Sequence, residues 1–264
     1  MATAVFEPRE SRLDHYFFPG LALLMLVTVF LGFARSYFLA GVFSAPLPNW
    51  LIHLHGAAFT LWILLLIAQT SLVAANRVEV HRKLGLAGFG LACLMVVLGI
   101  SASTDSLRRS FGASVTSADV MDPKTFYIIP LMDMLVFGTL VFLAFRARSN
   151  PPAHKRLILV ATTALTLAAV ARWPIPFIQH NPIWVAELCT YGFLVLLLAY
   201  DVYSSGKVHR VTIWASAFLI AVQRVRGASG RNGCVARFRY LGAEPRKNDP
   251  WMKPPPMASA LDWM

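Results

Sequence analysis

A histidine stands directly before one or two basic residues at three places, each where an apolar stretch begins. The phrases are Val80-His81-Arg82-Lys83-Leu84, Ala153-His154-Lys155-Arg156-Leu157 and Val208-His209-Arg210. Imidazoles at one depth on neighbouring helices can meet at a haem iron, which takes axial histidines on opposite faces. A simpler interpretation stays open, because basic residues at the cytoplasmic ends of helices also fix the topology of a membrane protein.

Two further histidines, His53 and His55, lie two residues apart in an apolar run. On a regular helix they point about 200° away from each other, so they cannot both bind one metal ion. From His55 a helical stripe continues through Phe59, Trp62, Leu66 and Gln69, which could line a planar cofactor or simply pack. His55, His81 and His154 are therefore the candidate ligands of a haem b, and no other metal site is predicted.

A second group of ionisable residues lies inside the apolar runs, where charge is costly and therefore informative. It consists of His53, Asp133, Arg172 and Glu187, together with His55. We expect these side chains to converge on a pocket in the outer half of the membrane, where Arg172 could pair with Glu187 or Asp133. Structural bonding between helices and a ligand, cofactor or proton site both remain open, although one such hydrogen bond contributes only about 0.6 kcal/mol.

Long apolar runs must position these groups. Of the 264 residues 57% are hydrophobic and 14% are charged, and the charges cluster between the runs. Spanning helices need about 20 apolar residues each. We predict them at 17–40, 50–74, 84–101, 125–145, 157–172 and 183–202, whereas 211–222 is too short to span comfortably. The fold class is all-α: a polytopic transmembrane bundle of six to seven helices, built of repeated two-helix hairpins behind helix one.

Three regions are predicted along the chain. Residues 1–16 form a cytoplasmic N-terminal segment, 17–222 the transmembrane bundle, and 223–264 an atypical basic, disordered tail. The net charge of +11 comes from basic residues that flank the apolar runs, which indicates membrane orientation rather than nucleic-acid binding. The positive-inside bias places the N-terminus in the cytoplasm. No phosphate-binding loop, metalloprotease or nucleophile-elbow motif occurs, so no catalytic residue is predicted and an enzymatic activity stays open.

Two long phrases carry a resemblance. They are HLHGAAFTLWILLLIAQTSLVAANRVEVHRKLG (53–85) and PLMDMLVFGTLVFLAFRARSNPPAHKRLILVATTAL (130–165). They resemble a family of uncharacterised bacterial multi-pass inner-membrane proteins over residues 16 to 222, and are loosely similar to b-type cytochrome-like membrane families. The resemblance implies a bacterial inner-membrane location and a helical bundle, and no assigned activity.

Three functions remain as hypotheses. The first is a haem-b-binding redox protein using His55, His81 and His154. The second is a small transporter or proton-coupled carrier using His53, Asp133, Arg172 and Glu187. The third is a non-enzymatic accessory subunit of a membrane complex. All three have the lipid bilayer as a partner, and a protein partner or a homo-oligomer is open in each.

Overall fold

The protein is described by a computed structural model over residues 9–43, 49–112, 123–179 and 183–241. Every regular element in these ranges is helical, which confirms the all-α fold class. Six helical segments are long and apolar enough to cross a membrane: Leu13–Phe38, Trp50–Ala74, Val78–Arg109, Tyr127–Arg146, Pro151–Val170 and Ile183–Ser205. The described chain therefore has the construction of a multi-pass membrane protein.

The helices follow one another with short connections. In chain order they are α1 (Arg9–Phe33), continued by a π-helical turn η1 (Ala34–Phe38), α2 (Trp50–Ala74), α3 (Val78–Gly112), α4 (Pro123–Arg146), α5 (Pro151–Val170), α6 (Pro176–Gln179), α7 (Ile183–Thr190), α8 (Gly192–Ser205) and α9 (Arg210–Leu241). Adjacent helices α2 and α3, and α4 and α5, pack against each other as the predicted hairpins.

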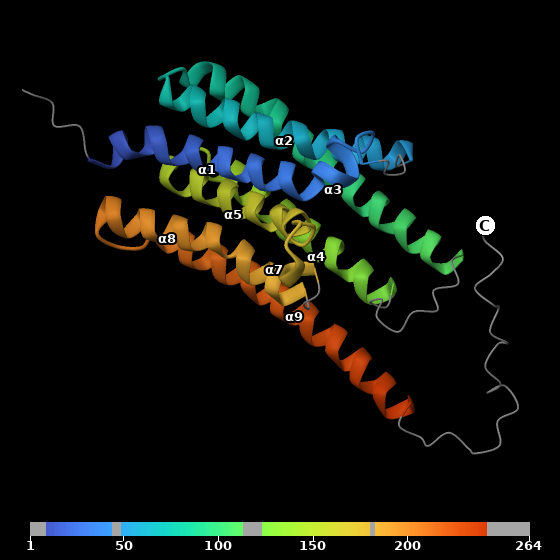
Figure 1. Cartoon of the computed structure of the whole chain (residues 1–264). Helices are drawn as coiled ribbons and strands as arrows, with labels where there is room; N and C mark the ends of the chain where they lie inside the picture. The colour runs from blue at the N-terminus through green and yellow to red at the C-terminus, as the bar shows by residue number, and fades with distance from the viewer. Residues whose placement is uncertain (1–8, 44–48, 113–122, 180–182, 242–264) are drawn as a thin grey trace, which may run out of the picture.

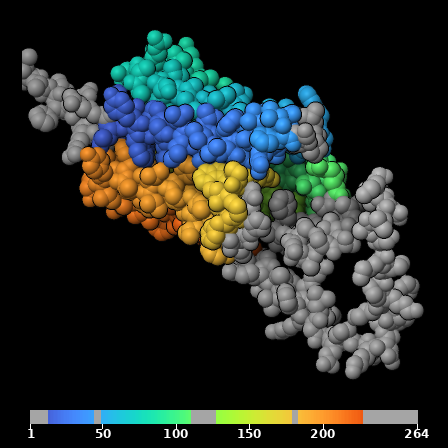
Figure 2. All heavy atoms as spheres, viewed as in Figure 1, coloured from blue at the N-terminus to red at the C-terminus, as the bar shows by residue number. Residues whose placement is uncertain are grey.

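Helix α5 is the centre of the bundle. It contacts α1, α4, α7, α8 and α9, and in Figure 1 it lies between α2 and α3 on one side and α8 and α9 on the other. On the face seen in Figure 2, α1 lies between α2 and α8. The buried face of α5 is rich in alanine and threonine, small residues that let membrane helices approach closely.

Several helix boundaries differ from the prediction, including the start of α3 at Val78 rather than 84. Helix α3 extends through the predicted loop to Gly112, where an exposed Asp105–Arg109 pair at i,i+4, 3.0 Å apart, supports the extra turns. Helix α5 begins at Pro151 rather than 157, because Asn150 caps Ala153 N and two prolines occupy the first turn. Helix α1 begins at Arg9, inside the segment predicted to precede the bundle.

Helix α9 also continues past residue 222, where the bundle was predicted to end. The apolar pattern stops there, but Gln223 and Arg226 are buried, and Arg226 is paired with acids on other helices. The polar residues thus continue the packed face that the apolar ones begin. The division into three regions stays a prediction, and residues 1–8 and 242–264 lie outside the described ranges.

Candidate functional site

A large pocket lies at the end of the bundle where the N-terminal part of α1 is located. It has a volume of about 1140 Å³ and is walled by α1 to α5, slightly above the ordinary range for ligand sites of about 300–1,000 Å³. Part of its wall is apolar and aromatic, with Phe18, Trp62, Leu66, Phe89 and Phe145. A ligand with a large flat apolar part fits such a wall.

Basic side chains gather at the same pocket. Its lining includes His15, Arg82, Arg148 and Lys155, against Asp14 as the one carboxylate among the lining residues. Arg82 and Arg148 are exposed, whereas Lys155 is half-buried and forms an ion pair with Asp14. The pocket therefore combines apolar walls with positive charge, a combination suited to an amphipathic anion.

Two of the predicted histidines meet at this pocket. The rings of His81 from α3 and His154 from α5 have centroids 6.3 Å apart and lie at 86° to each other. His154 Nδ1 lies 2.9 Å from the carbonyl oxygen of Ala144. When Nδ1 donates that bond, Nε2 keeps a free lone pair, which is the arrangement typical of metal-binding histidines.

Gln69 sets the hydrogen bonding of the other imidazole. With its amide oxygen 2.9 Å from Gly85 N, its nitrogen lies 2.8 Å from His81 Nδ1. In this orientation the amide donates to Nδ1, so the neutral ring carries its proton on Nε2. A half-turn of the amide lets Nδ1 donate to the oxygen and frees Nε2 to bind a metal. His81 therefore fits a ligand role only together with a rotated Gln69.

The third predicted ligand, His55, lies elsewhere. It is absent from the pocket lining, and its ring packs on Phe59 with centroids 4.2 Å apart. Its Nδ1 is buried with no hydrogen-bond partner in the described part of the chain. The stripe from His55 does reach the pocket further along α2, through Trp62, Leu66 and Gln69.

Of the second predicted group, only the acids converge. Arg226 of α9 donates from Nη1 to Asp133 of α4 at 2.7 Å and from Nη2 to Glu187 of α7 at 2.8 Å. Arg224 adds a bond to Glu187 and another to the Tyr191 hydroxyl, both 3.2 Å long. Two carboxylates thus face two guanidinium groups, and the cluster is formally neutral.

The pairing predicted for Arg172 is wrong. Its guanidinium donates to the carbonyl oxygen of Ala168 at 2.6 Å and lies over the Phe33 ring. His53 does not join the acids either, since its ring lies 5.7 Å from that of Tyr37. Arg172 follows the end of α5 at Val170, so its side chain bonds back to that helix end instead of reaching α4 or α7.

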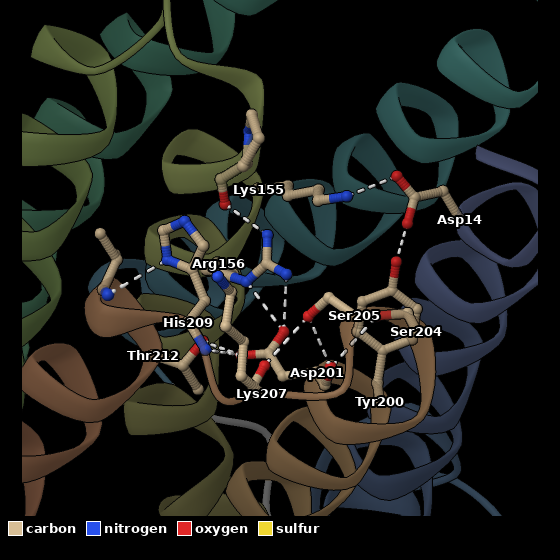
Figure 3. A network of polar contacts seen from close by, with 12 residues as sticks. Asp14, Lys155, Arg156, Tyr200, Asp201, Ser204, Ser205, Lys207, His209 and Thr212 are labelled. Atoms are coloured by element: carbon tan, nitrogen blue, oxygen red, sulfur yellow. Dashed lines mark hydrogen bonds and ion pairs between the residues drawn. The ribbon is translucent and has the colours of Figure 1, made fainter. Parts of the chain in front are cut away.

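A second buried ion pair was not predicted from the sequence. Arg156 and Asp201 are 1% and 0% exposed at their side chains and approach to 2.6 Å. Asp201 also accepts from His209 N at 3.1 Å and from Thr212 Oγ1 at 2.5 Å, so it joins α5, α8 and the start of α9. Figure 3 shows this network beside the Asp14–Lys155 pair and Tyr200, whose hydroxyl donates to Asp14.

The burial of Asp201 could have been predicted from the sequence, because this residue lies in an apolar run as Glu187 does. The burial of Arg156 could not, since basic residues at the start of a helix are already explained by membrane topology. His209, the third histidine of the repeated phrase, does not line the pocket. Among the described residues no three histidine, cysteine, aspartate or glutamate side chains are grouped to hold a metal ion.

No protein-family model, curated protein or solved structure matches this chain. The six spans define it as a multi-pass membrane protein.

Proposed function

We propose that this membrane protein binds one haem b in the pocket walled by α1 to α5, where His81 and His154 would hold the iron, and that it carries electrons. The observation behind the proposal is the meeting of two imidazoles at one large apolar pocket. The ring centroids of His81 and His154 lie 6.3 Å apart, so both imidazoles would be within reach of one iron ion in the pocket.

The other pocket residues support the same ligand. The aromatic wall at Trp62, Phe89 and Phe145 suits the apolar macrocycle of haem. Arg82 and Arg148 can pair with the two carboxylates of the haem. The bound iron would supply one-electron redox chemistry. The chain orients it through the two histidines, and Ala144 O and Gln69 orient the histidines in turn.

The pocket lies at the end of the bundle that carries the N-terminus. Basic residues are frequent there, including Arg77, Lys83 and Arg146. Because such residues favour the cytoplasmic side, we place the N-terminus and the pocket at the cytoplasmic face of a bacterial inner membrane. Electrons would then enter or leave the site on that side.

The carrier hypothesis receives less support. Asp133 and Glu187 are held by Arg224 and Arg226, and neither Arg172 nor His53 is beside them. A neutral, tightly bonded cluster suits the joining of α4, α7 and α9 better than a substrate site. No contact distinguishes the accessory-subunit hypothesis.

The test is a reduced-minus-oxidised visible spectrum of the protein purified in mild detergent after expression with ample haem. We expect a Soret band with sharp α and β bands, lost in His81→Ala and in His154→Ala. His55→Ala is the matched control, because His55 lies outside the pocket, and it should keep the full spectrum. A folded, colourless wild-type protein, or loss of haem in His55→Ala alone, would contradict the proposal.

A further inference from the structure

Helix α9 presents a buried polar stripe to the bundle. Thr212, Ser216, Leu219, Gln223 and Arg226 follow one another at spacings of four, three, four and three residues, so they share one face. All five are buried, Gln223 to 1% exposure. Helix α9 packs against α4 and α5, so four polar side chains are enclosed along this interface.

The two ends of the stripe are bonded to charged partners. Thr212 donates to Asp201, and Arg226 donates to Asp133 and Glu187. The middle is different: Ser216 Oγ, both amide atoms of Gln223 and Nε of Arg226 have no partner within the described residues. A buried polar atom left without a hydrogen-bond partner destabilises the fold, and lipid offers it no partner.

We infer that the inner face of α9 binds internal water at two positions, one at Ser216 and one between Gln223 and Arg226. The amide of Gln223 offers donors and an acceptor, Arg226 Nε offers a donor, and Ser216 offers both. Water can bond to both donors and acceptors, and one buried water molecule makes about three hydrogen bonds. An anion is not suited to this position, because Asp133 and Glu187 already balance the charge of Arg226.

Leu219 separates the two positions. It is fully buried and lies one turn from Ser216 on one side and from Gln223 on the other. The hydrated positions are therefore distinct sites and not a continuous file of water across the bundle. Ser216 lies one turn from Thr212, which bonds to Asp201, and the position between Gln223 and Arg226 adjoins the pair of Arg226 with Glu187.

X-ray hydroxyl-radical footprinting tests the inference directly, because radiolysis of bound water oxidises the side chains beside it. Methionine is readily oxidised to the sulfoxide, so Leu219→Met reports on the stripe. Leu197→Met on α8, equally buried and in the same hydrophobic cluster but outside the α9 stripe, is the matched control. We expect the methionine at 219 to oxidise several-fold faster than the one at 197, and adding Gln223→Leu to remove most of the difference. Equal oxidation of the two reporters would overturn the inference.

Thermal stability gives a second, independent readout. If Gln223 were dry, replacing it by the similarly sized methionine would remove unpaired polar atoms and raise Tm. If it holds water, Gln223→Met should lower Tm by about 2–4 °C, the shift that corresponds to 1 kcal/mol in a chain of roughly this size. Leu219→Met alone should change Tm little, as volume-conserving apolar exchanges do. A rise in Tm for Gln223→Met would contradict bound water there.

Discussion

The ion pair between Arg156 and Asp201 shows how a single buried charge depends on its partner. Both side chains are removed from solvent, and Arg156 also donates to Pro152 O at 2.8 Å. Such a pair contributes little net stability compared with apolar residues, but breaking it exposes the remaining charge to a medium that cannot solvate it. Its role is to fix how α5 meets α8 and α9.

Arg156→Met should therefore destabilise the protein by about 3–5 kcal/mol, since Asp201 would remain buried without its counter-ion. Thermal or denaturant unfolding in detergent measures the change. Adding Asp201→Asn to the same chain should restore part of the loss, because asparagine keeps the acceptor for Thr212. The control is Asp105→Asn in the exposed pair with Arg109, where a change of about 0–1 kcal/mol is expected. Equal losses at the two pairs would contradict this account.

Gln69 acts through His81 and gives a prediction on the proposed haem site. Gln69→Leu removes the acceptor that the rotated Gln69 amide offers to the Nδ1–H of a metal-bound His81, and loss of such a partner lowers metal affinity by about 10–100-fold. Gln69→Glu keeps an acceptor and makes the ring more electron-rich, so it should retain haem with a lower midpoint potential. Haem titration and redox potentiometry measure the two effects. Unchanged affinity and potential in both variants would exclude His81 as a ligand.

At the scale of the helices, one close approach holds α1 against α5. A Cβ atom added to Gly32 would lie 2.2 Å from the carbonyl oxygen of Ala169, far inside van der Waals contact. Because the obstacle is backbone and not a movable side chain, an added methyl group must push the two helices apart. Glycine at this position permits the contact.

Gly32→Ala should thus destabilise the protein by about 1–3 kcal/mol through overpacking. Gly20→Ala on the same helix is the matched control, because an added Cβ there meets nothing within 4 Å. That variant should be neutral or up to about 1 kcal/mol more stable, as expected from helix propensity. The melting temperatures of the two variants test this prediction. Equal melting temperatures would mean that α1 does not approach α5 as described.

The sequence predicted helices well where they are apolar and poorly where polar residues pack inside. The spans of α2 and α4 agree with their apolar runs to within about two residues. The first turns of α5 and the continuation of α9 were missed, because Arg156, Gln223 and Arg226 read as solvent-facing residues. Their burial depends on partners far along the chain, such as Asp201 and Asp133, which no local pattern identifies.

The candidate site was predicted in part for the same reason. The repeated phrase indicated that His81 and His154 share a depth on neighbouring helices, and the structure brings them to one pocket. Choosing Arg172 as the partner of the acids failed although α5 packs against both α4 and α7, because Arg172 lies beyond the end of α5 and bonds back to Ala168 O. The spacing of Thr212, Ser216, Leu219, Gln223 and Arg226 can be found in the sequence. It was not used, because the apolar run ends at residue 222 and the helix was predicted to end there.

For the whole molecule, the proposed orientation makes a prediction about sides of the membrane. The connections at 75–77, 147–150 and 206–209 lie at the end that carries the N-terminus, and should face the cytoplasm. A green fluorescent protein fused after residue 149 should fluoresce, and alkaline phosphatase fused there should be inactive. Fusions after residue 112 should give the opposite pair of results. An active phosphatase after residue 149 would reverse the orientation.

The central position of α5 has a consequence for how the chain enters the bilayer. Its span is the least apolar of the six, because it contains Arg156 and three threonines, all of which are buried in the bundle. A segment of this kind gains little from partitioning into lipid alone. We therefore expect α5 to be retained in the membrane only together with α4, so that the hairpin is the unit of insertion during synthesis.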